Sequence, residues 1–590
     1  MDRVKGLLFG EVQSGKTAHM FGIIAATADA DPGFKTFVLL TTNNRNLQQQ
    51  TIRRAFRQLS TFNVCDETDD ARFIHGGLSK PTLVILKKDP NVLKSWNAHL
   101  ASASRLKDGP IFILDDEADN ASLNTKVNLN ELSRTFELIQ TMRTRGTSSI
   151  YLEVTATPQS LLLQKFDSEI RPEFLQYFQP EPSYLGGGFF FTSPAPYVQV
   201  QISENEKADL LDAQSSATSG LKRAIATFLV TCAEFQNRGE SNANFLVHPS
   251  VGKGDHSVVA RKIESFLRKI REGIISSDVE MLLFAAHQDL EGSCPNIIPF
   301  EGVKDFLNSS AKINVYLLNS SEEAERDNSF EEGFNIVIGG NTLGRGVTFS
   351  KLQTVYYVRS AKTPQADTYW QHSRMFGYDR HPELIRLFMP PSLFRTFRVF
   401  HEANEKLVTQ LRSGNFDDIQ IVLEKGFAPT RKNVLDTSSY SLLVGGSNYF
   451  PPRPNETNFD KTETLLGIFE DSRNGHLISE KLASELLSES KTSDSTSWPV
   501  DAFRGAINAL HSQSNPPKIR LLTRRGRNIS KETGTLLSPD DRKLGTEFAE
   551  DILLTAYRLN GSKQQGWAGK PFWVLNVKLP EGMVYHRGQK

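Results

Sequence analysis

A segment near the start of the chain has the residue types and spacing of a phosphate-binding loop. Residues 10–17 read Gly-Glu-Val-Gln-Ser-Gly-Lys-Thr and match the pattern G-x-x-x-x-G-K-[ST] between an apolar run and a helix-forming segment. Glycines let backbone N–H groups close around phosphate oxygens, and the first turn of a helix attracts anions. We expect Lys16 to reach the β and γ phosphates and Thr17 to offer its hydroxyl to Mg²⁺. The expected nucleotide-binding residues here are Gly10, Gln13, Ser14, Gly15, Lys16 and Thr17. A glycine turn that merely opens a helix is the alternative.

Acidic residues follow a second apolar run. Residues 111–119 read Ile-Phe-Ile-Leu-Asp-Asp-Glu-Ala-Asp, which is typical of a buried strand with carboxylates at its C-terminal end. In an open α/β sheet, ligands bind at that end of the strands. We expect Asp116 to hold Mg²⁺, with Asp115 as the alternative, and Glu117 to polarise an attacking water as general base. A solvated acidic helix cap is the competing interpretation.

The elements that must position these side chains are indicated by short apolar runs between helix-like segments. Such runs predict strands of parallel sheets that are buried on both faces. The expected strands are residues 6–9, 36–40, 83–86, 111–114 and 151–154, then 245–247, 313–318, 336–338, 355–358 and 384–388. A helix is expected at residues 221–230.

The same alternation predicts the domain organisation. After about residue 404, Ser, Asn and turn clusters become frequent, which indicates a separate domain. The expected parts are a first sheet domain (1–165), a connecting helical segment (166–235), a second sheet domain (236–405) and a C-terminal accessory domain (406–590).

Composition limits the partners and the location of the protein. The 590 residues include 68 Lys and Arg and 68 Asp and Glu, so no global attraction to nucleic acid or anionic lipid is expected. Basic residues that meet nucleic acid must be grouped locally. Only three cysteines occur, and no apolar stretch approaches the roughly 18 residues of a membrane helix. We expect a soluble cytoplasmic protein without a signal peptide.

The order of short motifs resembles that of superfamily 2 helicases and translocases. Residues 116–119 spell their DEAD box, Thr-Ala-Thr-Pro at 155–158 resembles motif III, and residues 339–348 and 371–380 resemble motifs V and VI. The resemblance implies an α/β fold with two RecA-like parallel-sheet lobes, a superfamily 2 helicase-like core, that close around ATP and Mg²⁺. Residues 406–590 are expected to add a C-terminal α+β accessory domain.

The resemblance also implies an arginine of motif VI that neutralises charge developing on the γ-phosphate. Arg374 is favoured by alignment, and Arg380 is the other candidate. The two are six residues apart, so they cannot replace each other on one helical face. Asp379 stands where related chains often carry arginine, so the choice stays open. In motif V, Gly346 is expected to contact the nucleotide, and Arg345 the nucleotide or a strand.

More narrowly, the residues within these motifs are similar to those of the Z1-domain family of bacterial superfamily 2 ATPases, which is found in restriction-like and antiphage gene clusters. The residues that carry this similarity are 10–17, 47–51, 86–88, 115–122, 339–348 and 371–378. The similarity implies DNA as a partner, together with a nuclease or a MORC-type ATPase as partner protein. Because the sequence begins almost on the phosphate loop, no upstream segment is expected to recognise adenine.

Contacts with nucleic acid are expected in loops whose hydroxyl, amide and cationic groups suit backbone phosphates. The similarity places them at Thr42, Asn43, Arg45, Lys87 and Lys88, and at Thr342 and Arg345. Residues 518–527 concentrate five cations, including Arg524 and Arg525, which is enough for a phosphate patch. Ordinary solvated loops and an exposed basic turn are the alternatives.

Three functions follow from these patterns. The first is an ATP-hydrolysing helicase-like or translocase-like motor that acts on DNA in an antiphage or restriction-like defence system. The second is an endonuclease with an unrecognised centre in the C-terminal third, although no cluster of carboxylates with lysine or histidine is evident there. The third is an ATP-gated scaffold that recruits defence partners.

Overall fold

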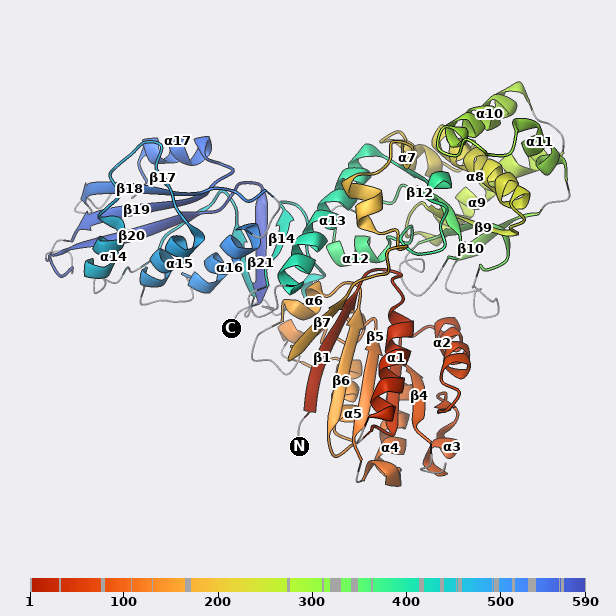
Figure 1. Cartoon of the computed structure of the whole chain (residues 1–590), viewed down its shortest axis with the longest axis horizontal. Helices are drawn as coiled ribbons and strands as arrows, with labels where there is room; N and C mark the ends of the chain where they lie inside the picture. The colour runs from red at the N-terminus through yellow and green to blue at the C-terminus, as the bar shows by residue number, and fades with distance from the viewer. Residues whose placement is uncertain are drawn as a thin grey trace. The chain divides into compact units, whose positions relative to one another are not determined.

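The computed structural model describes most of the chain, which falls into two compact units (Figure 1). The described residues are 3–30, 33–75, 80–107, 109–129, 131–164, 171–272, 276–309, 312–318, 330–340, 349–361, 364–412, 419–435, 440–452, 454, 459–490, 492, 498–511, 515–528, 537–561, 563 and 567–588. One unit spans residues 1–160, 172–401 and 430–434, and the other spans residues 161–171, 402–429 and 435–590. The first unit contains two parallel sheets, here called the first and second lobes, and the second unit is the C-terminal domain.

The first lobe is built on a seven-stranded sheet with the strand order β3-β4-β2-β5-β6-β1-β7, and all of its pairings are parallel. Its strands are β1 (Arg3–Gly10), β2 (Thr36–Thr41), β3 (Asn63–Cys65), β4 (Thr82–Lys87), β5 (Ile111–Asp116), β6 (Ser149–Thr155) and β7 (Phe174–Phe178). Its helices are α1 (Lys16–Asp29), α2 (Arg45–Gln58), α3 (Asp70–His75), α4 (Pro90–Ser102) and α5 (Arg134–Arg143), followed by the short α6 (Gln159–Leu162).

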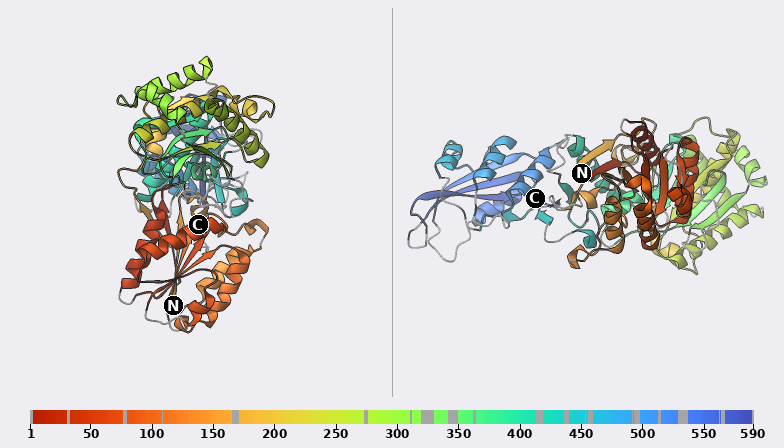
Figure 2. Two further views of the ribbon diagram at one scale, coloured as in Figure 1. Left: turned by 90° about the vertical axis from the view of Figure 1, so that its right-hand side faces the viewer. Right: turned by 90° about the horizontal axis from the view of Figure 1, so that it is seen from below.

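Helices cover both faces of this sheet (Figure 2). Side chains alternate between the faces of a strand, so Phe37 of β2 packs in one apolar cluster with Ile24 of α1, whereas Val38 packs in another with Trp96 of α4. Both faces are buried, which explains why the strands are continuous apolar runs. The carboxyl ends of β1, β2, β4, β5 and β6 therefore meet along one edge of the sheet.

The second lobe is built on a six-stranded sheet with the order β10-β11-β9-β12-β13-β8, again with parallel pairings. Its strands are β8 (Gln199–Gln201), β9 (Asn242–His248), β10 (Ile313–Leu318), β11 (Gly333–Gly339), β12 (Leu352–Tyr357) and β13 (Arg386–Met389). Its helices are α7 (Glu206–Leu211), α8 (Ser219–Asn237), α9 (Lys253–Arg271), α10 (Ser277–Glu291), α11 (Phe300–Asn308) and α12 (Ala366–Gln371), and α13 (Pro391–Arg412) follows β13.

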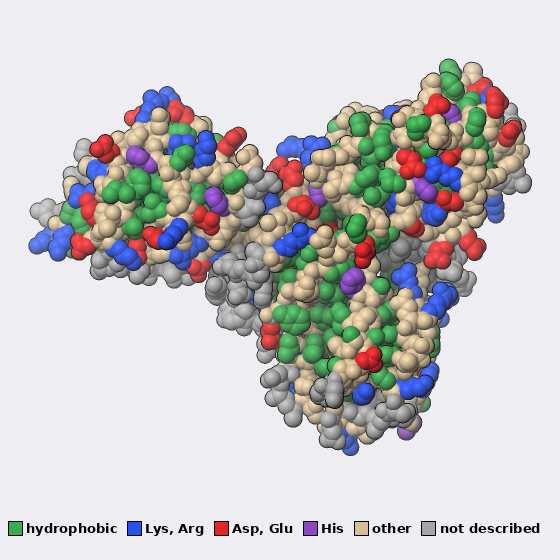
Figure 3. Space-filling model, in the orientation of Figure 1, with side chains coloured by type: hydrophobic (Ala, Val, Ile, Leu, Met, Phe, Trp, Pro, Cys, Tyr) green, Lys and Arg blue, Asp and Glu red, His purple; other side chains and the backbone are tan. Residues whose placement is uncertain are grey.

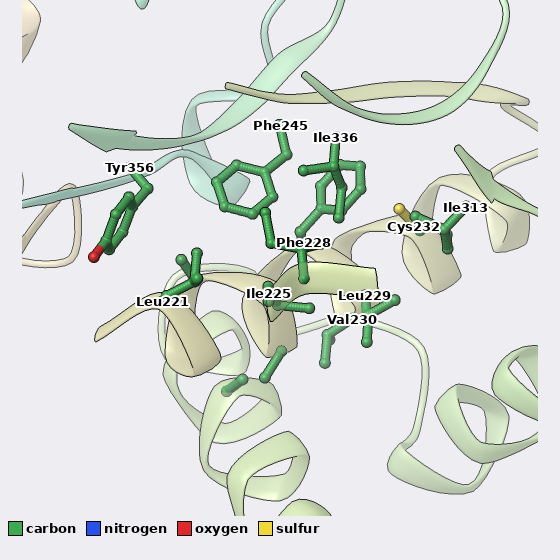
Figure 4. Packing of buried hydrophobic residues seen from close by; sticks show 14 of the residues in the cluster. Leu221, Ile225, Phe228, Leu229, Val230, Cys232, Phe245, Ile313, Ile336 and Tyr356 are labelled. Carbon is green, nitrogen blue, oxygen red and sulfur yellow. The ribbon is translucent and has the colours of Figure 1, made fainter. Parts of the chain in front are cut away.

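The helix α8 forms the centre of the second-lobe core. Figure 4 shows its side chains Ile225 and Phe228 directed toward Phe245 of β9 and Ile336 of β11, and all four are fully buried. Residues at spacings of three and four face the sheet, as an amphipathic helix requires. The helix α10 packs on α8 from outside, which explains why α8 is apolar on more than one face.

The C-terminal domain combines a three-stranded antiparallel sheet, β14-β21-β15, with a five-stranded mixed sheet, β16-β20-β19-β18-β17. Its strands are β14 (Ile421–Glu424), β15 (Tyr440–Val444), β16 (Asn448–Tyr449), β17 (His476–Leu477), β18 (Ile519–Asn528), β19 (Ile552–Asn560), β20 (Pro571–Lys578) and β21 (Met583–Gly588). Its helices are α14 (Phe459–Leu466), α15 (Glu480–Glu489), α16 (Val500–His511) and α17 (Pro539–Glu547). Trp498, Phe503 and Leu554 lie in its core.

The predicted fold class, α/β with two parallel-sheet lobes and a C-terminal α+β domain, is confirmed. All ten predicted apolar runs overlap strands, although the run at 384–388 begins in a 3-10 turn two residues before β13, and the predicted helix at 221–230 lies inside α8. The segment 166–235, expected to be a helical connection, differs in detail: it supplies β7 to the edge of the first sheet and β8 to the edge of the second. These edge strands are short and partly exposed, so they lack a continuous apolar run.

Two expectations from composition concern cysteines and membrane helices. Cys65, Cys232 and Cys294 are buried and form no disulfide. In the part of the chain that the structure describes, no helix is both long and apolar enough to span a membrane.

Candidate nucleotide-binding site

The predicted phosphate loop joins β1 to α1. Gly15 has a φ of 93° and Gln13 a φ of 57°, so both adopt the left-handed backbone conformation. Glycine adopts this conformation without strain, whereas at Gln13 the contacts of the surrounding structure must stabilise the strained backbone. The half-buried Lys16 folds back over the loop, and its ammonium donates to the backbone oxygens of Glu11 (2.8 Å) and Gly10 (3.5 Å). The loop thus presents its lysine at the N-terminus of α1, where anions are favoured.

The acidic residues at the end of β5 lie beside this loop. Asp115 is fully buried, Asp116 is half-buried, and Glu117 has a φ of 54°, a strained conformation for a residue with a side chain. Burial and the negative charge of Glu117 raise the pKa of Asp116 to about 7, while Lys16 and Lys88 oppose the shift. Carboxylate and hydroxyl oxygens are ligands that Mg²⁺ prefers, so Asp116 and Thr17 fit Mg²⁺ by their donor atoms.

The buried Lys88 shapes the acidic loop. Its ammonium pairs with the carboxylate of Asp115 at 2.9 Å, and both side chains are fully buried. The other acceptors are the backbone oxygens of Asp116 (2.8 Å), Glu117 (2.9 Å) and Asn120 (3.1 Å) and the hydroxyl of Ser122 (3.1 Å). The expectation that Lys88 contacts nucleic acid is therefore wrong, because its charge is enclosed and its three N–H donors are used inside the lobe.

The alternative that Asp115 holds the metal ion also conflicts with these contacts. One of its carboxylate oxygens accepts from Lys88, and the other accepts a short hydrogen bond from the hydroxyl of Tyr151. Burial, followed by the negative charge of Asp115, raises the pKa of Tyr151 well above its usual value, so the hydroxyl stays protonated as the donor. Asp116 is then the strand carboxylate left for a cation.

Asp119, the last residue of the segment that resembles a DEAD box, connects the two lobes. One carboxylate oxygen of Asp119 accepts from Thr155 (2.6 Å), and the other accepts from the amide of Gln371 in α12 (2.5 Å). The same amide donates to the hydroxyl of Thr157 (2.8 Å). All four side chains are buried, so this network links residues 116–119 and 155–158 of the first lobe to Gln371 of the second without intervening solvent.

The two candidate arginines of motif VI have different surroundings. Burial lowers the pKa of Lys16, and the positive charge of Arg374 lowers it further, against the raising effects of Glu117 and Asp116. The guanidinium of Arg374, which is 6% exposed, therefore lies near the phosphate-loop lysine.

Arg380 instead holds the motif VI loop together. Its acceptors are the backbone oxygens of Phe349 (3.0 Å), Phe376 (3.1 Å) and Tyr378 (3.0 Å) and the side chains of Asp379 (2.5 Å) and Gln13 (3.3 Å). Its guanidinium is buried, and that burial lowers its pKa. Arg380 thus contacts the phosphate loop through Gln13, and both of its terminal nitrogens already donate hydrogen bonds within the protein.

Two tyrosines that the sequence analysis missed also contact the phosphate loop. Tyr184 donates to the backbone oxygen of Val12, and Tyr378 donates to that of Ser14 (3.3 Å). Their ring centroids are 5.4 Å apart. Tyr378 lies inside the quoted motif VI, so its place there could have identified it, whereas Tyr184 stands in a segment with no motif.

Motif V contributes little to the described geometry. Thr342, Arg345 and Gly346 lie outside the described residues, so their roles stay predictions. Gly340 just before them is described, and a Cβ there would come within 2.9 Å of the His256 ring and of the backbone oxygen of Ser250. The chain therefore requires glycine where it enters this motif.

The other predicted nucleic-acid residues of the first lobe follow β2 and β4. Arg45 is exposed at the start of α2, Asn43 is exposed and donates to Asp89 (3.4 Å), and Thr42 is half-buried. Lys87 is half-buried and pairs with Glu67 at 3.1 Å. Asn43 and Arg45 thus remain accessible to a ligand.

The predicted C-terminal phosphate patch is occupied by internal ion pairs. Arg524 pairs with Asp541 (2.9 Å) and Arg525 with Asp471 (2.8 Å), and the Arg525 guanidinium also lies over the ring of Trp573. On the face in Figure 3, basic and acidic side chains of this domain are interspersed. Arg524 is largely buried in its pair, so it does not form the free phosphate contact that was expected.

Comparisons with known proteins find two matching families. Residues 220–424 match the family model of the Z1 domain, and residues 443–581 match that of the "Restriction endonuclease CglI H-subunit, C-terminal domain". Among curated proteins, none matches the sequence.

Solved structures that resemble this chain include a restriction endonuclease domain and helicases. The C-terminal domain of the CglI restriction endonuclease H subunit is 28% identical with a TM-score of 0.22, over 23% of this chain and 99% of that chain. S. cerevisiae Dbp5 bound to RNA and ADP BeF3 is 14% identical with a TM-score of 0.37, over 67% of this chain and 83% of that chain. The DUF1998 helicase MrfA bound to DNA and AMPPNP is 11% identical with a TM-score of 0.35, over 70% and 52%. Since these TM-scores are low, the fold is assigned from the strand order of the sheets.

Proposed function

We propose that this chain is a Mg²⁺-dependent ATPase of the superfamily 2 helicase-like type. The observation that carries the proposal is the contact of the second lobe with the phosphate loop, where Tyr378 donates to the backbone oxygen of Ser14 (3.3 Å) and Arg380 to the side chain of Gln13 (3.3 Å). Arg374 of the same segment is buried, and its charge acts on Lys16 of the loop. An arginine held opposite a phosphate-loop lysine is positioned to stabilise charge that develops on the γ-phosphate. The network of Gln371 with Asp119 and Thr157 supports the same arrangement, because it holds the two lobes in contact beside the loop.

Each residue of the site has a role in this proposal. Lys16 and the loop N–H groups bind the phosphates, and Glu117 accepts a proton from the attacking water as general base. Arg374 is the arginine finger, and Arg380 positions the motif VI loop against Gln13. Asp116 and Thr17 would hold Mg²⁺, which when bound would draw charge from the β and γ phosphate oxygens.

We further propose that ATP turnover drives movement along DNA or its remodelling in a bacterial antiphage or restriction-like system. The matches to the Z1 domain and to a domain of a restriction endonuclease subunit support this part of the proposal. Asn43 and Arg45, and the motif V residues Thr342 and Arg345, are the proposed contacts with the strand. A nuclease or a MORC-type ATPase is the proposed partner protein.

The test is the rate of phosphate release from ATP. Lys16→Ala and Glu117→Gln should each lower the rate about 100-fold or more, because they remove phosphate binding and the general base. Lys35→Ala and Glu137→Gln, exposed changes in the same lobe, are the matched controls and should leave it unchanged. Unchanged release in both site variants would overturn the proposal. Turnover that neither DNA nor RNA stimulates would favour an ATP-gated scaffold over a motor.

An endonuclease is the second candidate, favoured by the match of residues 443–581 to a restriction endonuclease subunit domain. Incubation of plasmid with Mg²⁺ or Mn²⁺ separates the two. Cleavage that persists in Lys16→Ala but is lost when the residues after about 410 are removed would support the endonuclease.

A further inference from the structure

The second lobe contains a basic pocket that the proposed ATPase site does not use. A cavity of about 320 Å³ lies between α9, the first turn of α8 and the residues 213–217 that connect α7 to α8. Lys222, Arg261, Lys262 and Lys269 line it, and none of the described residues that line it is acidic. Four positive charges from two helices thus surround one small concave surface.

One of these lysines builds the wall of the pocket. Lys262 is buried, and its ammonium donates to the backbone oxygens of Asp209 (3.2 Å) and Leu210 (2.7 Å) and to the hydroxyl of Ser215 (2.7 Å). Its three N–H donors are therefore used inside the lobe. These bonds fix the connecting residues 213–217 against α9, so that side of the pocket is already formed without a ligand.

The other three cations are not neutralised. Lys222, Arg261 and Lys269 form no ion pair with any described residue, and Arg261 makes only a 3.4 Å hydrogen bond from Nε to the backbone oxygen of Ser257. Like charges that converge in a concave surface repel each other, and the concave shape focuses their field. An anion bound among them would relieve this repulsion, so the pocket is suited to a negatively charged ligand.

The remaining lining groups indicate which anion. Hydroxyls of Ser216 and Ser265 add neutral donors, whereas the Ser215 hydroxyl already donates to the backbone oxygens of Asp209 and Asp212, and arginine matches the geometry of phosphate oxygens in particular. Phe266 and Val258 offer an apolar surface for an uncharged part of the ligand. The volume is at the lower end of small-molecule sites, roughly 300–1,000 Å³. A nucleic-acid backbone is bound by an extended basic patch or stripe, whereas these cations line one small concave surface.

We propose that this pocket binds a small phosphorylated ligand, an organic phosphate of the size of a nucleotide, at a second anion site separate from the phosphate loop. Lys222, Arg261 and Lys269 bind the phosphate group, and the hydroxyls of Ser216 and Ser265 complete its hydrogen bonds. The proposal does not depend on ATP hydrolysis, because no residue of the pocket belongs to the motifs of the ATPase site.

The test is calorimetric binding of pyrophosphate to the full-length protein that carries Lys16→Ala, which weakens the phosphate loop as a competing site. Adding Lys222→Ala and Lys269→Ala together should weaken binding about tenfold or more, because two charge-assisted contacts are lost. Arg268→Ala is the matched control: Arg268 precedes Lys269 on α9, is exposed and does not line the pocket, so binding should stay unchanged.

Equal affinity in the double variant and the control would overturn the proposal. If the double variant instead loses affinity for a single-stranded oligonucleotide while pyrophosphate binding stays unchanged, the pocket contacts nucleic acid and the proposal is also overturned. Thermal unfolding of each variant shows whether it folds, and Arg261→Gln is a second, milder variant that should reproduce the loss. All these outcomes are read from binding, so they are independent of whether the protein hydrolyses ATP.

Discussion

Lysines of the two lobes differ in whether their positive charge has a partner within the protein. Lys88 in the first lobe is fully buried, pairs with Asp115 and fills the rest of its hydrogen-bonding capacity with loop carbonyls. Lys222 and Lys269 in the second lobe face a pocket with no described anionic partner. A charge whose partners are all internal stabilises the fold, whereas convergent charges without partners destabilise it slightly and favour a ligand.

The role of a cation in this protein therefore depends on the side chains that surround it. Lys88 was expected to contact nucleic acid because it lies in a segment that resembles a strand-contacting motif. The pocket of the second lobe carries no such motif, yet its charges are the accessible ones. Variants that remove one charge at a time should separate these two cases by the sign and size of the change in stability.

The largest effect is expected for Lys88→Met. Removing the ammonium leaves the carboxylate of Asp115 buried without its ion-pair partner, which should lower the free energy of unfolding by about 3–5 kcal/mol. The backbone oxygens of the Glu117 loop also lose a donor, so phosphate release should fall as well. Urea unfolding of the full chain, followed by circular dichroism, measures the change.

The adjacent Lys87 provides the control. Its pair with Glu67 is partly solvent-exposed, so Lys87→Met should cost at most about 1 kcal/mol. The double variant Lys88→Met/Asp115→Asn should recover part of the loss, because the unpaired charge is then absent. Equal costs at positions 87 and 88 would contradict the assignment of Lys88 as a structural cation.

A smaller effect is expected at His401, a potential cation that the fold keeps neutral. Burial lowers its pKa from 6.5 to about 4, and its Nε2 lies 2.7 Å from the hydroxyl of Thr192. Because the folded-state pKa is depressed, its contribution to stability is full above pH 6.5 and is lost as the pH falls toward 4. At pH 5 the loss should be about 2 kcal/mol.

The measurement is urea unfolding at pH 7.5 and pH 5 for the wild type and for His401→Gln. The change in the free energy of unfolding between pH 7.5 and pH 5 should be about 2 kcal/mol smaller in the variant, whatever the other histidines contribute. His75→Gln, at the exposed histidine that ends α3, is the matched control and should leave the difference unchanged. If both variants respond to pH as the wild type does, His401 does not titrate in this way.

A still smaller effect is expected for Arg525→Ala in the C-terminal domain. The pair with Asp471 is about one-third exposed, so its loss should cost about 0.5 kcal/mol. Affinity for DNA should not change at low or at high salt, because the charge already has an internal partner. A weaker affinity with a salt slope reduced by about one would restore the interpretation as a phosphate patch.

Much of the fold could be predicted because parallel strands buried on both faces must be apolar at every position. The edge strand β7 was missed because alternate residues are exposed, as in Phe174–Phe178. The phosphate loop and the acidic end of β5 were predicted for a similar reason: their chemistry requires particular residue types at fixed local spacing, as at Gly15 and Lys16.

The partners of the site residues could not be predicted, because they come together only in the folded chain. Gln371 reaches Asp119 across 252 positions, and Tyr184 reaches Val12 across 172. No local pattern records such contacts. The charge of Lys88 was visible in the sequence, but its enclosure by Asp115 and three carbonyls was not, and that enclosure decides its role.

The smallest effect, and the one opposite in sign, is expected for Lys269→Ala without ligand. Removing one of three convergent unpaired charges relieves repulsion, so the free energy of unfolding should rise by at most about 0.5 kcal/mol at low salt and by less at high salt. Arg268→Ala on the same helix should change it by less. With added pyrophosphate the wild type should become more stable than Lys269→Ala, because the wild type gains binding energy that the variant lacks. A loss of stability in Lys269→Ala at low salt, of the kind expected at Lys88, would show that this lysine also serves the fold.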